Sequence, residues 1–295
     1  MPSAFKQVSK IGLGCVTFGR EIDQTAAFAM MDYAFDRGIT FFDTASAYGA
    51  GASETIIGNW LNANRMKAEA IMVGTKIVPP YTPESIIASV SRSLARLQME
   101  KIDLLYFHSW HPAASTVEAL KVMNDLVESG KVHLLGASNF TAEQLVNAVR
   151  VQKDNNFAPF SFIQNNHNLA VSELSEELRH VCVKNEIRIV SYSPLAAGFL
   201  TGKHQLEVQP GSRFDLIPDH QNVYFHEHAY RRLVHLQSLA SRNRLSPAHL
   251  ALAWALHQPD VSSVLIGGRT PAHIDQAFAA IDFYDAELFD ELECN

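Results

Sequence analysis

Eight short apolar segments alternate with amphipathic segments along this chain, and this alternation limits the fold more than any other feature. The strand-like segments cover residues 11–14, 40–43, 71–75, 103–108, 132–137, 160–164, 188–192 and 264–266. The helical segments cover residues 25–37, 53–62, 85–97, 116–129, 141–151, 172–185, 246–257 and 270–280. Eight strand–helix repeats predict an α/β fold whose parallel sheet closes into a (β/α)8 TIM barrel.

Two pieces exceed the simple repeat. A polar loop at residues 198–223 precedes an extra helix expected at 226–241, after the seventh strand, and a last short helix is expected at 286–292. No Ser/Gly-rich linker or charge run divides the chain. We therefore expect a single domain over residues 1–295.

Composition excludes several classes of protein. The hydrophobic content of 47% is that of an ordinary soluble globule, and the net charge of -7 disfavours nucleic acids and anionic membranes as partners. Residues 1–6 lack the apolar run of a signal peptide, and no segment has the length of a membrane helix. Cys15, Cys182 and Cys294 lack CxxC spacing, which argues against a disulfide framework or a zinc knuckle. We expect a cytoplasmic protein.

Polar side chains end three successive strand-like segments. Asp43 closes the second segment and Tyr48 lies in the loop after it, Lys76 follows the third, and His108 closes the fourth. Parallel neighbours would bring these four together at one rim. A phenol with a pKa of about 10 needs a nearby cation to donate its proton at neutral pH. Lys76 can be that cation, with Asp43 as its counter-ion and His108 orienting a substrate oxygen. Each residue alone could merely cap a strand, but together they favour a catalytic site.

Several blocks, in order along nearly the whole chain, resemble the aldo-keto reductase superfamily. Residues 42–49 with Ser53 and Glu54 resemble its first active-site block, and Lys76 and His108 stand where its other tetrad members belong. Residues 130–140 resemble its "GKV..xGxSNF" segment. Residues 191–203 are similar to a block of its potassium-channel β-subunit-like and pyridoxal-reductase-like branches.

The resemblance implies NAD(P)H-dependent reduction of a small-molecule aldehyde or ketone without metal or flavin. Arg269 at the start of the last barrel helix favours NADP(H), because a guanidinium binds a 2′-phosphate, with NAD(H) as the alternative. It implies that Tyr48 protonates the carbonyl oxygen, while Lys76 and Asp43 tune Tyr48 and His108 positions the substrate. Channel-associated relatives leave a second reading open, an NADP(H)-binding redox-sensing partner protein with slow turnover. The sequence identifies neither the physiological carbonyl nor a partner protein.

The resemblance also implies the cofactor contacts. Ser138, Asn139 and Gln164 would hold the nicotinamide carboxamide, and Tyr192 would stack on its ring. Lys203 and Arg213 would lie near the pyrophosphate, and Arg269 and His273 near the adenosine ribose, because the loops after strands seven and eight of a barrel often bind phosphate. The full expected set is Cys15, Val16, Asp43, Ser138, Asn139, Gln164, Tyr192, Ser193, Pro194, Leu195, Lys203, Arg213, Gly267, Arg269, His273 and Gln276.

Ordinary structural roles stay open for some of these residues. Ser138 and Asn139 could cap the next helix, Tyr192 could belong to the core, and Lys203 and His273 could be solvated.

This chain departs from the family pattern at two places. Gln276-Ala277 replaces a Glu-Asn pair that contacts adenine in many members, and Cys15 and Val16 replace a Thr and a larger residue. We expect substrate contacts, by position, from the loop at 198–223 and from a set of side chains near the strand ends: Phe18, Tyr48, His108, Trp110, His111 and Phe140.

Two other enzyme classes compete with this reading. Gly12, Gly14 and Gly19 suggest a dinucleotide-binding glycine loop of a Rossmann dehydrogenase, but Thr17 stands where the third glycine belongs. The 13 histidines suggest a metal-dependent barrel hydrolase, but no carboxylate-rich ligand set ends the strands. We expect no metal site.

Overall fold

The computed structural model describes residues 8–204 and 207–294. Every strand in this part of the chain overlaps a segment expected from the sequence. The strands are β1 Ile11–Gly14, β2 Phe41–Asp43, β3 Met72–Ile77, β4 Ile102–Phe107, β5 Val132–Ser138, β6 Phe160–Asn166, β7 Arg188–Tyr192 and β8 Val261–Gly267.

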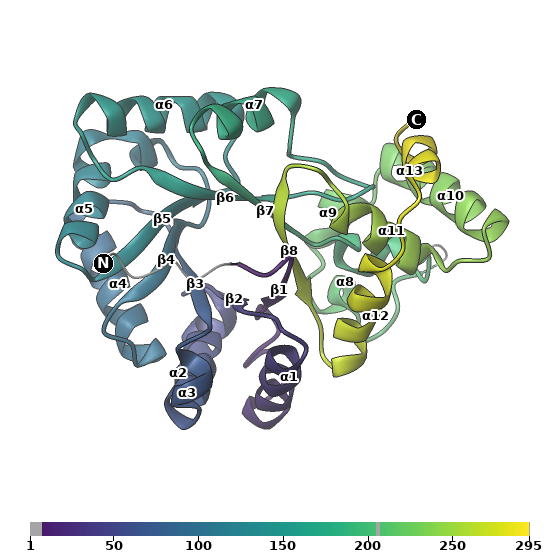
Figure 1. Ribbon diagram of the computed structural model, residues 1–295, viewed down its shortest axis with the longest axis horizontal. Coiled ribbons are helices and arrows are strands. Elements are labelled where there is room, and N and C mark those ends of the chain that lie inside the picture. Colours follow the sequence, from purple (N-terminus) through teal and green to yellow (C-terminus); the bar gives the residue numbers. More distant parts are fainter. Residues whose placement is uncertain (1–7, 205–206, 295) are drawn as a thin grey trace.

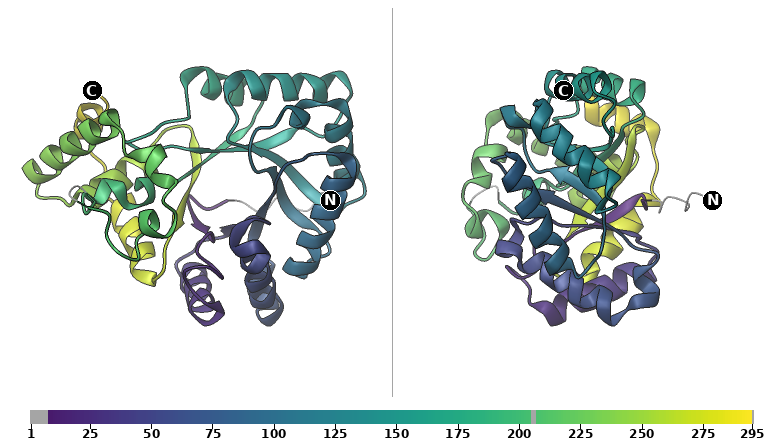
Figure 2. Two further views of the ribbon diagram at one scale, coloured as in Figure 1. Left: turned by 180° about the vertical axis from the view of Figure 1, so that it is seen from behind. Right: turned by 90° about the vertical axis from the view of Figure 1, so that its left-hand side faces the viewer.

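The strands form a closed parallel barrel in sequence order. The ring closes between β1 and β8, where Leu13 pairs with Ile266 and Gly14 with Gly267. Figures 1 and 2 show the helices arranged around these strands. The predicted (β/α)8 barrel is confirmed. The open sheet of a Rossmann dehydrogenase is excluded, because a closed barrel has no sheet edge or switch point.

Helices follow the strands, and most of them begin at a residue whose side chain caps the first turn. The Thr141 side chain, for example, forms a capping box with Gln144 at the start of α6. The helices are α1 Gln24–Asp36, α2 Ala52–Ala63, α3 Arg65–Ala68, α4 Pro83–Leu97, α5 Val117–Glu128, α6 Ala142–Asp154, α7 Glu176–Lys184, α8 Arg213–Leu216, α9 His220–Tyr224, α10 Glu227–Arg242, α11 Pro247–Leu256, α12 Pro271–Ile281 and α13 Ala286–Glu293, with 3-10 turns η1 Tyr48–Gly51, η2 Pro112–Ser115 and η3 Ala196–Thr201.

The extra helix after β7 and the short C-terminal helix are confirmed as α10 and α13. Two local expectations were wrong. Helix α7 begins at Glu176 instead of residue 172, because Ser175 caps it while Ser172 forms a bridge with His167. The stretch at 198–223 is not a plain loop, since it holds the end of η3 and the short helices α8 and α9. In Figure 1 these helices lie with α10–α13 on one side of the barrel.

The strands of the barrel lie between two buried apolar clusters. One buried cluster lies between the barrel and its helices. The barrel interior is filled by a second cluster, which consists of Phe41, Met72, Leu104, Tyr106, Phe162, Val190 and Leu265. Side chains alternate along a strand, so residues an even number of positions further on face the same interior. That rule places the side chains of four residues inside the barrel, between the interior cluster and the carboxyl ends of the strands: Asp43, Lys76, Gln164 and Tyr192.

The structure leaves the amino-terminal segment outside its description. The sequence predicts no signal peptide at residues 1–6, and this prediction concerns a segment outside the described residues. Within residues 8–204 and 207–294, no helix combines the length and apolar character that a bilayer crossing requires.

Helix α2 packs so closely on the end of α4 that we predict Gly58→Ala to destabilise the protein. A Cβ atom at Gly58 would lie 2.3 Å from the Arg96 carbonyl oxygen. Helix propensity alone would make alanine more stable by about 1 kcal/mol, but overpacking a core contact costs about 1–3 kcal/mol. Urea unfolding of the variant should therefore show a lower midpoint, and a raised midpoint would contradict the close contact.

Candidate active site at the carboxyl end of the barrel

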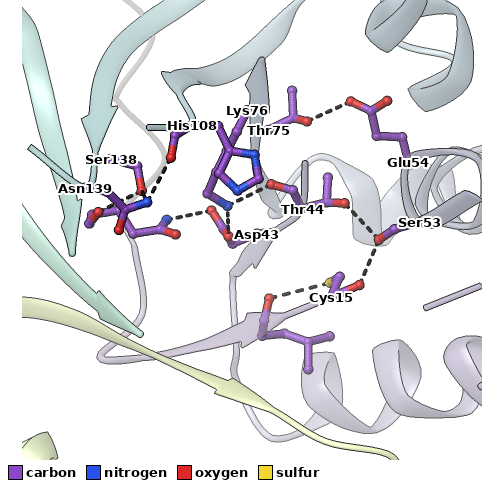
Figure 3. Close-up of polar contacts among 12 residues, drawn as sticks. Cys15, Asp43, Thr44, Ser53, Glu54, Thr75, Lys76, His108, Ser138 and Asn139 are labelled. Carbon is purple, nitrogen blue, oxygen red and sulfur yellow. Dashed lines mark hydrogen bonds and ion pairs between the residues drawn. The ribbon is translucent and has the colours of Figure 1, made fainter. Parts of the chain in front are cut away.

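The four residues predicted to act together come from adjacent strand ends. Asp43 is the last residue of β2, Lys76 is the next-to-last residue of β3, and His108 directly follows β4. Tyr48 begins η1, the turn after β2. All four line one cavity, and Figure 3 shows the Asp43, Lys76 and His108 side chains close together.

Lys76 and Asp43 form an ion pair whose side chains are only 1% and 2% exposed. Lys76 Nζ also donates a hydrogen bond of 2.8 Å to the Thr44 carbonyl oxygen. The second oxygen of Asp43 accepts a hydrogen bond of 2.9 Å from Gln164 Nε2. Burial on its own would lower the pKa of Lys76, but the negative charge of Asp43 and the Tyr48 side chain outweigh it and raise that pKa. The lysine therefore remains an ammonium ion.

Tyr48 lies directly beside this ammonium ion. Lys76 Nζ is 5.3 Å from the centroid of the Tyr48 ring. Burial raises the pKa of Tyr48, and the positive charge of Lys76 opposes this shift without overcoming it. The effect of Lys76 has the sign expected from the sequence, but the net direction is upward. The phenol therefore keeps its proton at neutral pH, as a proton donor must.

His108 is a neutral group next to the phenol. Its ring meets the Tyr48 ring edge-on, with the centroids 5.6 Å apart. Burial, together with the charge of Lys76, lowers the pKa of His108 to about 3. Within the described part of the chain, His108 Nδ1 is buried without a hydrogen-bond partner.

Amide and hydroxyl groups from β5–β7 form the opposite wall. Ser138 Oγ donates a hydrogen bond of 2.8 Å to the Gln164 carbonyl oxygen. The Tyr192 hydroxyl donates one of 2.7 Å to Asn139 Oδ1. Asn139 Nδ2 in turn donates one of 2.8 Å to the His108 carbonyl oxygen. Asn139 has a left-handed φ of 59°, a backbone conformation that asparagine tolerates better than most residues.

A cavity of about 600 Å³ extends from the tetrad to the loops after β7 and β8, the size of a small-molecule site. Every residue expected to contact the cofactor lines it, from Cys15 and Val16 after β1 to His273 and Gln276 on α12. Thr17 and Glu21, in the loop after β1, also line the cavity and were not expected there, because they carry no strand-end or motif signal. Leu216 and His220 line it too, and they belong to the stretch at 198–223 from which substrate contacts were expected.

The far end of the cavity is rich in cationic side chains, which have different partners. Arg213 pairs with Glu21 across the cavity, with Nη1 3.1 Å from the carboxylate. Arg269 Nη1 donates a hydrogen bond of 3.0 Å to the Gly211 carbonyl oxygen. A pairing of Arg269 with Asp275, the simplest alternative to a cofactor role, is not formed, because Asp275 contacts Arg37 and Tyr33.

The expected substrate contacts are only partly placed in this cavity. Tyr48 and His108 line it, whereas Phe18, Trp110, His111 and Phe140 do not. Phe18 and Phe140 are 0% and 1% exposed, and the Trp110 ring packs edge-on against Phe140. The His111 side chain caps η2. Phe18 and Phe140 belong to the buried apolar cluster and Trp110 packs against it, because burial of their large apolar surface is favourable.

The buried histidines lead us to predict a loss of stability in mild acid. Burial lowers the pKa of His108 to about 3 and that of His167 to about 4, while both are about 6.5 in an unfolded chain. Below pH 6.5 the unfolded chain therefore takes up protons that the folded chain does not. As the pH falls from about 6 to 4, each histidine should therefore lower the free energy of unfolding by up to about 1.4 kcal/mol per pH unit.

Urea unfolding at several pH values tests this prediction. His167→Asn should reduce the slope of stability against pH, and the exposed His180→Asn should leave it unchanged. Equal slopes in all three proteins would show that His167 titrates normally.

Comparison with known proteins agrees with this geometry. The profile of the aldo/keto reductase family matches residues 10–293. The "Probable aldo-keto reductase 1" of Glycine max is 31% identical over 93% of this chain and 81% of its own length. "Protein tas" of Escherichia coli K12 is 27% identical over 99% of this chain and 94% of its own.

One relative, from a fungus, is named as a reductase of a particular compound. "Norsolorinic acid reductase" of Aspergillus flavus is 28% identical over 98% of this chain and 80% of its own length. The family match covers almost every residue of the barrel described above. The chain therefore belongs to the aldo/keto reductase family, a family of oxidoreductases.

Proposed function

We propose that this protein reduces an aldehyde or ketone to an alcohol with NADPH, with Tyr48 as the general acid. The observation that carries the proposal is the buried Lys76–Asp43 ion pair directly beside the Tyr48 phenol. A protonated phenol, a fixed ammonium ion and a neutral imidazole within one cavity are the groups that protonation of a carbonyl oxygen requires. The free thiols of Cys15, Cys182 and Cys294 support a reducing, cytoplasmic location.

The cavity suits a nicotinamide dinucleotide. Its amide wall of Ser138, Asn139 and Gln164 offers donors and acceptors to a carboxamide, and the Tyr192 ring stands in the same wall. The opposite end offers Lys203, Arg213 and Arg269 to phosphate groups. When bound, the reduced nicotinamide supplies the hydride for the carbonyl carbon.

The protein's own groups handle the substrate oxygen. Tyr48 donates its hydroxyl proton as negative charge develops on that oxygen, and Lys76 stabilises the resulting phenolate. Asp43 keeps Lys76 charged and in place. This division of roles explains why a buried ion pair stands beside a group that must lose a proton.

His108 orients the same oxygen through a hydrogen bond from Nε2. The ring is neutral, so only one nitrogen carries a proton. Nδ1 is buried and has no partner within the described chain, and an orphaned buried N–H is rarer and less favourable than an unfilled lone pair. The proton therefore belongs on Nε2, which can donate to a carbonyl oxygen.

We predict that Tyr48→Phe abolishes turnover while cofactor affinity stays within about twofold. The variant removes the proton donor but no group at the far end of the cavity, and general acid catalysis contributes at least about a hundredfold to kcat. NADPH oxidation over a panel of aldehydes and ketones, with NADPH binding measured by fluorescence, makes the test.

Tyr81→Phe is the matched control, because the Tyr81 hydroxyl donates to the Ser109 carbonyl oxygen and does not line the cavity. If Tyr48→Phe kept turnover, Tyr48 would not be the acid. If the wild type bound NADPH but reduced no carbonyl, the redox-sensing alternative would replace the enzyme.

We also predict tighter binding of NADPH than of NADH, with Arg269 as a main cause. A guanidinium forms planar, charge-assisted hydrogen bonds with a 2′-phosphate that a 2′-hydroxyl cannot match. Such bonds contribute about 1.5–3 kcal/mol, or at least tenfold in affinity. Arg269→Ala should lower the NADPH/NADH affinity ratio about tenfold. Arg150→Ala, on the exposed surface of α6, should not change it, and an unchanged ratio in both variants would remove Arg269 from this role.

A further inference from the structure

The first turn of α2 holds two fully buried polar side chains behind the tetrad. Ser53 and Glu54 are both 0% exposed. Ser53 Oγ lies 2.8 Å from Thr44 Oγ1 and donates a hydrogen bond of 2.8 Å to the Cys15 carbonyl oxygen. Figure 3 shows this second layer of contacts beside the ion pair. The helix start is thus bonded to residues that directly follow β1 and β2.

The Glu54 carboxylate reaches the third strand. Glu54 Oε1 accepts a hydrogen bond of 2.7 Å from Thr75 Oγ1, and Oε2 pairs with Arg96 Nη1 at 3.0 Å. Thr75 directly precedes Lys76 on β3, and side chains alternate along a strand, so the two point to opposite faces of the barrel wall. A bond that fixes Thr75 on the outside therefore fixes the direction of Lys76 on the inside.

The partner of Glu54 also contacts the turn that carries the phenol. A Cβ atom at Gly51 would lie 2.4 Å from the Arg96 guanidinium carbon, so Arg96 packs directly on the last residue of η1. Gly51 also has a left-handed φ of 95°. Through Arg96, the same carboxylate is joined to the Tyr48 turn and, through Thr75, to the Lys76 strand.

A buried carboxylate is costly, and helix packing alone does not require one. Removing such a charge from water costs several kcal/mol, and apolar residues of similar size often replace buried ion pairs without loss of stability. This carboxylate lies between the two segments that carry Tyr48 and Lys76, and a role in holding these segments together would explain why a charge is buried there.

We propose that Glu54 is a positioning residue, whose hydrogen bond with Thr75 holds Lys76 at the distance from Tyr48 that proton donation needs. This inference rests on the proposed carbonyl reduction. A misplaced ammonium ion leaves cofactor binding intact but stabilises the phenolate less well, so the chemical step slows.

Thr75→Val tests the bond with little change in side-chain shape. Single-turnover oxidation of bound NADPH by an aldehyde gives a rate constant for the chemical step, and misfolded protein lowers its amplitude instead of its rate. We expect Thr75→Val to slow this step about tenfold with NADPH affinity within twofold, and Thr75→Ser to restore it. Thr75→Ala should slow the step to the same extent, and it replaces Thr75→Val in the test if that variant is insoluble.

Glu54→Gln and Asp103→Asn form a matched pair of amide replacements, because both carboxylates accept a hydrogen bond from a residue of β3. Asp103 is also buried, and its carboxylate accepts a hydrogen bond of 2.9 Å from Val73 N, near the opposite end of β3. Glu54→Gln should slow the chemical step about as much as Thr75→Val, and the double variant should be no slower than either. Asp103→Asn should lower thermal stability without slowing the step.

Three results would overturn the positioning role. They are an unchanged rate in Thr75→Val, no rescue by Thr75→Ser, or an equal slowing in Asp103→Asn. If Tyr48→Phe is inactive while Thr75→Val keeps the wild-type rate, only the role of Glu54 fails. If Tyr48→Phe remains active, the proposed function itself fails.

Discussion

Two opposite charges held away from water are the constraint on which the site depends. An isolated ammonium or carboxylate in the interior costs several kcal/mol, so Lys76 and Asp43 are stable only as a pair with further hydrogen bonds. The Thr44 carbonyl group and the Gln164 amide supply those bonds. Asp43 belongs to β2 and Gln164 to β6, which face each other across an eight-stranded ring. A closed barrel is therefore the condition for the hydrogen bond from Gln164 to Asp43 that supports the ion pair.

The apolar core and the polar site lie at different levels along the axis of the barrel. Large apolar side chains fill its interior below the site, and polar side chains begin one layer higher on the same strands. The loops after β7 and β8, with the short helices α8 and α9, then extend the cavity toward Arg213 and Arg269. The Glu21–Arg213 pair joins the loop after β1 to this region, so the cavity has walls from both ends of the chain.

Local patterns predicted most of the architecture but less of the substrate side. Strand-end residues such as Asp43 and Lys76 were recognisable because alternation and strand order both follow from nearby sequence. Phe18 and Phe140 were expected in the pocket but are buried, since an aromatic residue near a strand end carries no mark of the direction it faces. Glu54 was recognisable as part of a block that resembles the family's first active-site block, but nothing near it in the sequence indicates that Thr75 bonds to it.

The sequence by itself determined the order of strands and helices and the identity of the groups at the strand ends, because period and capping signals act over a few residues. Only the tertiary structure decided the partners of these groups and their protonation. Asp275 pairs with Arg37 rather than Arg269, and burial raises the pKa of Tyr48 despite Lys76. Desolvation and pairing depend on every element packed around a group, and those elements are distant in sequence.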